Sequence, residues 1–336
     1  MTDLFSPLTI KNLTLKNRIV LPPMANNMAD DSGAVTDAHV AHYVRRAKAG
    51  VGMVIVEHAY IRRDGRVNAR QLGIHDDGLI PGLRRLAEAV KACDTVVGIQ
   101  ITHGGGKVTQ ATAGTQPLAP SDGLVPGGSE AARALTQAEV EAVAQAFVAA
   151  ARRALAAGFD FVEVHGAHGY LLSQFLSPLA NRRSDAYGGG LIGRLALPLQ
   201  VVRAVRQVVD DKHLLLYRLG ASDYMPDGLT EAEGRQAARS LAAAGVDLLD
   251  ISGGLNGSEP PGWDKTSQGY YVPMAAAIRT EVDIPVVVAG GITDPHFANR
   301  VVAEGRVDLV AIGRAMLADA EWAVRARQVT AGGQSQ

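Results

Sequence analysis

The stretch Phe159-Asp-Phe-Val-Glu-Val-His-Gly-Ala-His-Gly-Tyr170 joins a short apolar run to two histidines and a tyrosine. Near-continuous apolar runs of this length are typical of parallel strands that are buried on both faces. The preceding segment, Thr136–Ala157, has the pattern of a helix, with Thr136 and Glu139 as a capping box and Gly158 after its last turn. The stretch is therefore predicted to be a buried strand that follows a helix and ends in three polar side chains.

The same unit of apolar run and helical segment recurs along the chain. The eight runs are Arg18–Pro22, Val51–Glu57, Val96–Thr102, Phe159–His165, Leu214–Leu219, Val246–Ser252, Ile284–Ala289 and Val307–Ile312. Helical segments between them include Asp37–Ala49, Leu79–Ala92, Thr136–Ala157, Leu195–Val209, Thr230–Ala244, Pro273–Thr280 and Pro295–Glu304. This repetition predicts a single α/β domain over residues 1–336, folded as a (β/α)8 TIM barrel. A doubly wound open sheet is the alternative, but it usually has a Gly-rich turn after its first strand, where this chain has Pro22-Pro23-Met24.

Two segments lie outside the repeating unit. Leu4–Asn17 contains two short alternating runs, which predict a β-hairpin that closes the bottom of the barrel. Gly104–Leu135, after the third strand, is rich in Gly, Ala, Pro and Ser, and such a long loop is either a lid or a tolerated insertion. We expect a lid-like insertion there.

Composition narrows the function classes. The hydrophobic share is 47%, the charged share is 20%, the formal net charge is −1, and no apolar run approaches the roughly 18 residues of a membrane span. We therefore expect neither a membrane nor a nucleic-acid partner, and a cytoplasmic location. The only cysteine, Cys93, excludes an intrachain disulfide and a cysteine-ligated iron–sulfur cluster within one chain.

The ends of the seventh and eighth predicted strands carry bare backbone. Gly290-Gly291 ends one strand and Gly313-Arg314 ends the other. The loops after these two strands are the usual phosphate site of a TIM barrel, and glycine amides allow a phosphate to approach closely. We therefore favour phosphate binding over the alternative that these glycines only make tight turns.

Polar side chains at other strand ends can be interpreted as ligand contacts or as internally satisfied core residues. Arg218, at the end of the fifth strand, needs an anionic or carbonyl partner, because a lone buried charge is unfavourable. That partner is either a ligand or an internal carboxylate such as Glu163 or Asp250. His58 is compatible with a ligand contact and with a satisfied core position. Gln100 could contact a ligand, but such a residue taken alone is more often a satisfied core amide.

The block from His165 to Gly189 resembles the hallmark segment of the old yellow enzyme family, the FMN-dependent ene-reductases. The likeness continues through Leu4-Phe5-Ser-Pro7, Pro23-Met24, Gly98-Ile-Gln100, Arg218, Ala289-Gly-Gly291 and Ile312-Gly-Arg314. It implies NAD(P)H as the reductant of FMN, a small α,β-unsaturated carbonyl compound as substrate, and a homo-oligomer. It also implies that FMN contacts Pro23, Met24, Ala25, His58, Gln100, Arg218, Gly290, Gly291, Gly313 and Arg314.

In that family two residues bind the carbonyl oxygen of the substrate and one donates a proton. The resemblance assigns the first role to His165 and His168, and the proton donor to Tyr170, with Asn27 beside the substrate. Two departures from the family pattern follow the first strand: Ala25 stands where Cys or Thr is usual near the flavin, and Asn27 stands where one branch has tyrosine. A further departure is Gly106, which replaces an arginine often seen before Lys107. A flavin-dependent desaturase, aromatase or C=C isomerase of a cyclic carbonyl compound therefore stays an alternative.

Two function classes without flavin are also compatible with a barrel. His58, His103, His165 and His168 could gather a zinc ion in a metal-dependent hydrolase. That class commonly begins with His-x-His at the first strand, which this chain lacks, and we predict no metal site. A phosphosugar isomerase would use only the phosphate site, but it would want an acid/base carboxylate at the first or fifth strand end.

Overall fold

Eight parallel strands close into one barrel, in the order β10-β11-β12-β3-β4-β5-β8-β9. The computed structural model describes residues 2–264 and 266–332. The barrel strands are β3 (Ile19–Leu21), β4 (Met53–Tyr60), β5 (Val96–Thr102), β8 (Phe161–Gly166), β9 (Leu214–Gly220), β10 (Leu248–Ser252), β11 (Val286–Val288) and β12 (Leu309–Ala311). Each falls within or beside one of the eight apolar runs, so the predicted TIM barrel is confirmed.

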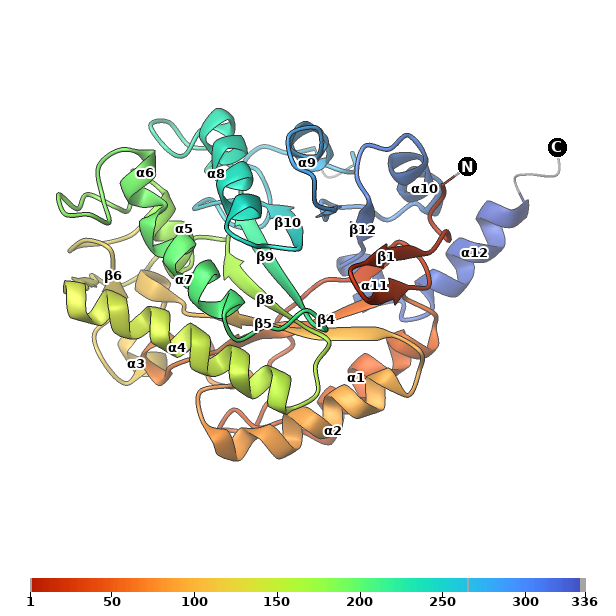
Figure 1. The fold of residues 1–336 in the computed structure, drawn as a ribbon, viewed down its shortest axis with the longest axis horizontal. Coiled ribbons are helices and arrows are strands. Elements are labelled where there is room, and N and C mark those ends of the chain that lie inside the picture. Colours follow the sequence, from red (N-terminus) through yellow and green to blue (C-terminus); the bar gives the residue numbers. More distant parts are fainter. Residues whose placement is uncertain (1, 265, 333–336) are drawn as a thin grey trace.

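Helices surround the strands (Figure 1). Those that follow the predicted pattern are α1 (Asp37–Lys48), α2 (Ile80–Lys91), α4 (Gln137–Ala156), α7 (Ala196–Arg206), α8 (Glu231–Ala243), α9 (Val272–Arg279) and α10 (Pro295–Ala303). Shorter or unforeseen ones are α5 (Leu171–Leu176), α6 (Leu191–Arg194), α11 (Arg314–Ala318) and α12 (Trp322–Gly332). The predicted capping box is present at α4, where the Thr136 hydroxyl accepts from the Glu139 amide. None of the helices in the described residues is long and apolar enough to cross a membrane.

Two apolar layers hold the barrel together. One lies between strands and helices, and the other fills the lumen, because successive side chains of a strand point to opposite faces. The lumen layer includes Met53, Phe161 and Leu214, and it is joined by Ile10 and Leu15. These last two belong to the hairpin β1 (Leu8–Ile10) and β2 (Leu13–Leu15). The hairpin therefore closes the end of the barrel where the strands begin, as predicted.

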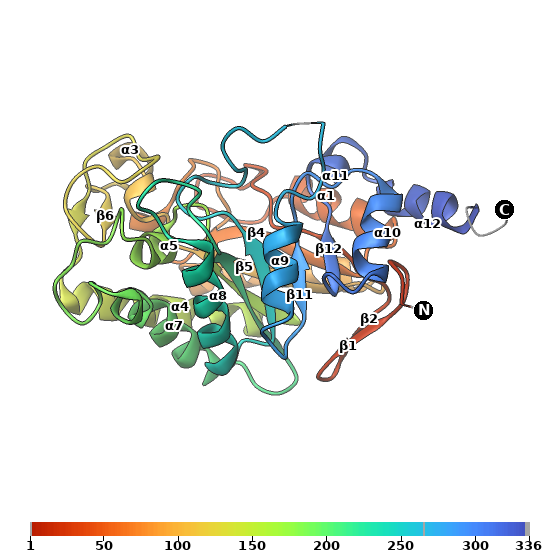
Figure 2. The ribbon, with the colours of Figure 1, turned by 90° about the horizontal axis from the view of Figure 1, so that it is seen from above.

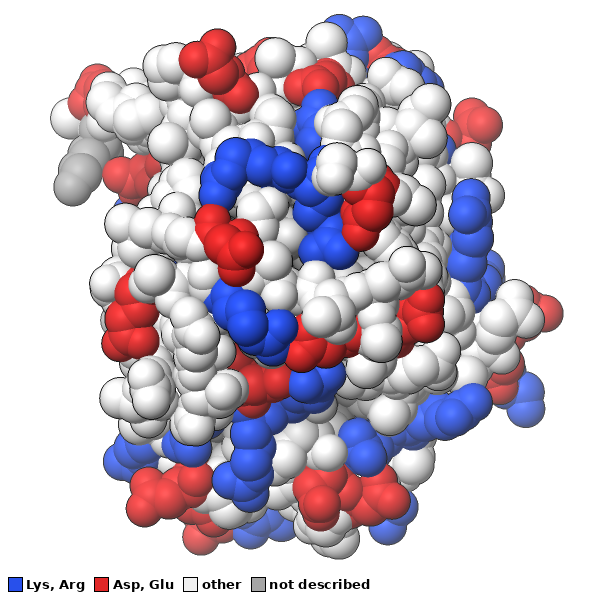
Figure 3. Space-filling model, turned by 90° about the vertical axis from the view of Figure 1, so that its left-hand side faces the viewer, with Lys and Arg blue, Asp and Glu red and all other residues white. Residues whose placement is uncertain are grey.

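The long connection over residues 104–135 lies at the other end (Figure 2). It contains a 3₁₀ turn at Gly105–Lys107, the short helix α3 (Gln110–Ala113), and the strands β6 (Leu118–Ala119) and β7 (Arg133–Ala134), which pair with each other. Acidic and basic side chains are intermixed on the face that carries this connection and α6 (Figure 3).

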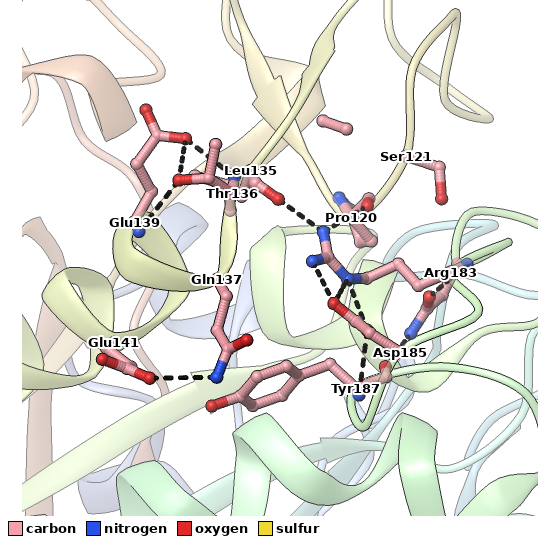
Figure 4. A network of polar contacts seen from close by, with 12 residues as sticks. Pro120, Ser121, Leu135, Thr136, Gln137, Glu139, Glu141, Arg183, Asp185 and Tyr187 are labelled. Carbon is pink, nitrogen blue, oxygen red and sulfur yellow. Dashed lines mark hydrogen bonds and ion pairs between the residues drawn. The ribbon is translucent and has the colours of Figure 1, made fainter.

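Arg183 fastens this connection to the segment that follows α5 (Figure 4). Its guanidinium donates to the carbonyl oxygens of Leu135 and Pro120, at 2.5 and 3.0 Å, and pairs with Asp185. The neighbouring Arg182 amide donates to the Ser121 hydroxyl at 2.8 Å. The two longest connections of the chain therefore hold one another above the barrel mouth.

Candidate active site

A cavity of about 340 Å³ opens where the barrel strands end. Its walls come from the ends of β9 to β12, from the loop after β3, and from the loop after β10. The residues of the last loop on the lining are Ser258, Glu259, Trp263, Ser267, Tyr270 and Tyr271. The predicted cofactor residues on its lining are Met24, Arg218, Gly290, Gly291, Gly313 and Arg314. The other predicted residues, Pro23, Ala25, Asn27, His58, Gln100, His165, His168 and Tyr170, are not on this lining.

The glycines on the cavity wall are there for steric reasons. Gly290 and Gly291 have φ values of +134° and +67°, which side-chain-bearing residues rarely adopt. A Cβ atom on Gly290 would lie 3.0 Å from the Tyr271 amide nitrogen, and one on Gly313 would lie 2.9 Å from Met24 Sδ. Because side chains at these positions would clash, the wall consists of bare backbone that a ligand can approach closely. This wall therefore fits a phosphate group.

Arg314 is the cation of this wall. Its Nη1 lies 2.9 Å from Glu259 Oε2, and its Nη2 donates to the Tyr270 hydroxyl at 3.2 Å. Both partners belong to the loop after β10. The guanidinium is more than half exposed, so it can also reach an anion in the cavity.

Arg218 has the predicted internal carboxylate as a partner and also lies where a ligand could reach it. It lines the cavity, and its Nε also lies 3.1 Å from Asp250 Oδ2, although without hydrogen-bond alignment. The ion pair with Asp250 does not use the guanidinium fully, because the Nε proton has no aligned acceptor among the described residues. A carbonyl edge of a ligand at the mouth fits this arginine.

Gln100 lies deeper than predicted. Its Nε2 donates to Glu163 Oε1 at 2.7 Å, and its Oε1 has no hydrogen-bond partner among the described residues. Burial and the charge of Asp250 raise the pKa of Glu163 to about 8. Burial also raises the pKa of Asp250, to about 6, against the opposing charge of Arg218.

The two histidines and the tyrosine of the opening stretch form one aromatic cluster beside the cavity. The ring centroid of His165 lies 5.1 Å from that of His168 and 5.0 Å from that of Tyr170, and the rings of both pairs are nearly perpendicular. Arg218 is the neighbour of His165 across strands β8 and β9, and Ser252 bonds His168 Nε2 at 2.7 Å. Because Arg218 and Ser252 also line the cavity, the cluster borders it.

Local geometry fixes how the two histidines present their protons. The Ala167 amide donates to His165 Nδ1 at 3.3 Å, so the neutral ring carries its proton on Nε2. His168 has a φ of +56°, a strained conformation that functional sites often hold. Its amide donates to the carbonyl of Gly253 at 2.9 Å, which ties the turn after β8 to the loop after β10.

Burial sets the protonation of the cluster. It lowers the pKa of His165 and His168 well below the usual value, with help from neighbouring positive charge, and it raises the pKa of Tyr170. At neutral pH the cluster therefore holds two uncharged imidazoles and one protonated phenol. It can bind a carbonyl oxygen through N–H donors and supply a proton from the phenol.

Gln71 and Lys107 are among the residues of this site to which the sequence analysis assigned no role. Gln71 Nε2 donates to His58 Nδ1 at 2.8 Å, and the His58 ring lies 5.6 Å from that of Tyr170. Lys107 Nζ donates to the His168 carbonyl at 2.8 Å, and burial lowers its pKa. Gln71 lies in a loop without pattern, whereas Lys107 follows three glycines at the end of the third strand, a signal that could have identified it.

The loop after β3 carries the two departures from the family pattern. Ala25 and Asn27 are both exposed there, and Asn27 has a φ of +53°. Pro23, by contrast, is buried. Among the described residues no three His, Cys, Asp or Glu side chains are grouped as a metal site would require.

Comparison with known proteins places this geometry among flavin enzymes. The model of the NADH:flavin oxidoreductase / NADH oxidase family matches residues 3–331. The NADH oxidase of Thermoanaerobacter brockii is 41% identical over 97% of this chain, which spans 51% of that protein. The NADPH dehydrogenase of Geobacillus sp. (strain WCH70) is 41% identical over 96% of this chain and 92% of its own length.

Solved structures agree in fold. The 2-naphthoyl-CoA reductase in complex with 2-naphthoyl-CoA has a TM-score of 0.92 and 28% identity, over 97% of this chain and 52% of that one. The old yellow enzyme homologue from Zymomonas mobilis has a TM-score of 0.84 and 25% identity, over 97% of this chain and 92% of that one. The chain thus spans about half the length of some relatives and nearly all of others.

Proposed function

Because the chain belongs to the NADH:flavin oxidoreductase / NADH oxidase family, we propose that it reduces the C=C bond of α,β-unsaturated carbonyl compounds. Family membership implies FMN as cofactor and NAD(P)H as its reductant. The observation that carries the proposal is the cluster of His165, His168 and Tyr170 beside the cavity. Its uncharged donors suit a carbonyl oxygen that gains negative charge during the reaction.

The cavity wall fits FMN on the features described above. Gly290, Gly291 and Gly313 would give the phosphate close backbone approach, and Arg314 would exchange part of its contact with Glu259 for the phosphate. Arg218 would face the carbonyl edge of the ring system. When bound there, FMN supplies hydride acceptance from NAD(P)H and hydride donation to the substrate.

The chain's own residues would then handle the oxygen and the proton. His165 Nε2–H and an N–H of His168 would donate to the substrate's carbonyl oxygen and stabilise the negative charge that develops on it. Tyr170, protonated at neutral pH, would pass its hydroxyl proton to the α-carbon.

Half-reactions of the FMN-loaded protein test this proposal. NADPH added without oxygen is expected to bleach the flavin bands, and 2-cyclohexenone added next is expected to restore them and to yield cyclohexanone. Tyr170→Phe should slow the second step and leave the first unchanged. Tyr217→Phe is the matched control, because that buried hydroxyl has no hydrogen-bond partner among the described residues and Tyr217 is not on the cavity lining.

Three results would reject or redirect the proposal. Flavin bands that never appear, even after FMN is added, would reject the cofactor assignment. Flavin that NADPH and NADH leave oxidised would favour the desaturase, aromatase or isomerase alternative. Flavin that NADPH bleaches but enones do not reoxidise would exclude the substrate class. The homo-oligomeric state stays a prediction that light scattering would test.

A further inference from the structure

Four polar side chains lie together in the barrel lumen, one layer below the mouth. Gln100, Glu163, Arg218 and Asp250 come from the neighbouring strands β5, β8, β9 and β10. Gln100 is opposite Glu163 in the strand register, and Arg218 is opposite Asp250. All four are buried, and Arg218 is the one that also reaches the cavity. The carbonyl and proton chemistry proposed above uses neither carboxyl group.

The charges of this group do not balance when both carboxyl groups are ionised. Arg218 is the one cation of the group, and Asp250 is paired with it at 3.1 Å. Glu163 accepts one hydrogen bond, from Gln100 to Oε1, whereas its Oε2 has no partner among the described residues. An ionised Glu163 would add an uncompensated negative charge inside the barrel, which is unfavourable. Its free Oε2 can instead carry a proton.

We propose that Glu163 is a positioning residue for the redox chemistry, which binds one proton from solvent when the cofactor is reduced and releases it when the cofactor is oxidised. The inference rests on the proposed function, because it requires a flavin above Arg218. Glu163 does not contact that cofactor itself. It acts through Arg218, whose field it strengthens when protonated and weakens when ionised.

The balance of charge follows from hydride transfer. NAD(P)H delivers two electrons and one proton, so the cofactor gains one negative charge above Arg218. That charge raises the affinity of Glu163 for a proton, and an ionised Glu163 then takes one from solvent. When hydride passes to the substrate and Tyr170 protonates the α-carbon, the added negative charge moves to the Tyr170 phenolate. Once the phenolate has taken a proton from solvent the added charge has left the site, and Glu163 returns its own proton to solvent.

The surroundings place this exchange on the alkaline side of neutrality. Burial and Asp250 raise the pKa of Glu163 to about 8, against the opposing effects of Arg218 and Gln100. His165 on the same strand and His58 on β4 are uncharged at this pH, because burial lowers the pKa of both. The strands β3, β11 and β12 add apolar side chains to the lumen. Below about pH 8 Glu163 is already protonated, so the exchange operates above it.

The midpoint potential of the FMN-loaded protein, measured from about pH 6 to about pH 10, tests the inference. Uptake of one proton lowers the reduction equilibrium constant tenfold per pH unit, about 30 mV for a two-electron couple. In the unchanged protein we expect the reduction equilibrium constant to fall tenfold per pH unit below about pH 8 and hundredfold per pH unit above it. In Glu163→Gln it should fall tenfold per pH unit over the whole range. Asp250→Asn should move the break to lower pH, because the Asp250 charge raises the pKa of Glu163.

Glu57→Gln provides a matched control. Glu57 is another fully buried glutamate, but it is partnered by His39 Nε2 at 2.8 Å and by the Asn26 amide at 3.1 Å. This variant should retain the break. A single slope in the unchanged protein, or a break that survives in Glu163→Gln, would overturn the inference.

A measurement without FMN separates this inference from the proposed function. Infrared spectra of the flavin-free protein should show the carbonyl stretch of a protonated carboxyl group that Glu163→Gln removes and that fades as the pH rises past about 8. Absence of that band overturns the inference even if the enzyme reduces enones. A band that is present while neither NADPH nor NADH bleaches the flavin instead refutes the proposed function. If Glu163→Gln does not fold, the pH dependence of the midpoint potential of the unchanged protein still tests the inference.

Discussion

Replacing His165 with alanine should slow hydride transfer to the substrate by about 10²–10³-fold, the usual effect of losing one donor to a developing oxyanion. The structure supports a single-donor loss, because His165 donates through Nε2 alone while the Ala167 amide occupies its Nδ1. His168 keeps its own position, held by Ser252 at 2.7 Å. One of two donors would therefore remain.

The same substitution also removes a structural contact. The Ala167 amide would lose its acceptor in a buried place, which costs about 1–3 kcal/mol of the free energy of unfolding. His165→Asn separates the two effects, because its Oδ1 can accept from the amide while its Nδ2 donates toward the cavity. We expect it to recover most of the stability and part of the rate.

Stopped-flow measurement of the two half-reactions, with a thermal melt of each variant, provides the assay. His165→Ala should leave flavin reduction by NADPH unchanged and slow reoxidation by 2-cyclohexenone. An equal loss in both half-reactions would mean that His165 supports the cofactor rather than the substrate. A loss smaller than about tenfold in reoxidation would refute the donor role.

The remaining predictions concern the cofactor, pH and the long connection. Ala25→Cys should raise the flavin midpoint potential, because a thiol can donate a hydrogen bond at an exposed position of the loop after β3; an unchanged or lower potential contradicts this. The melting temperature should fall from about pH 7 to pH 5, because burial lowers the pKa of His42 to about 4 and of His165 and His168 further, so the unfolded chain binds more protons below about 6.5. A melting temperature that is flat over this range would show that these imidazoles do not govern acid stability. Arg183→Ala should increase hydrogen exchange over residues 104–135, since it removes two bonds to their carbonyls; Arg152→Ala, on the exposed face of α4, should not.

The sequence predicts the scaffold well because each barrel unit is encoded locally. Apolar runs, capping residues and C-terminal glycines such as Gly158 and Gly245 act within one strand or one helix turn. The hairpin was equally local. Helix α12 was not singled out, and neither was the pairing of β6 with β7, which joins residues far apart in a loop without periodicity.

The sequence predicts which side chains gather at the strand ends, but not which of them pair with one another. The residues at strand ends are visible along the chain, because every parallel strand contributes its last residues to the same mouth. Which of them touch depends on the register between strands. Arg218 faces Asp250 rather than Glu163, and Gln100 turns to Glu163 rather than to the mouth, because neighbouring strands place them opposite one another.

The mouth of the barrel has two halves that respond differently to substitution. The half that we assign to the phosphate consists mainly of glycine backbone, where an added side chain would meet Tyr270, Tyr271 or Met24. The other half consists of the side chains that we propose to meet the substrate. The exposed positions Ala25 and Asn27 lie in the loop after β3, which also contributes Met24 to the cavity. Substitutions at Ala25 and Asn27 can therefore alter the flavin midpoint potential or the substrate preference without disturbing the glycine backbone of the cavity wall. The departures from the family pattern at Ala25 and Asn27 therefore lie outside the glycine backbone of Gly290, Gly291 and Gly313, which is constrained by its own close contacts.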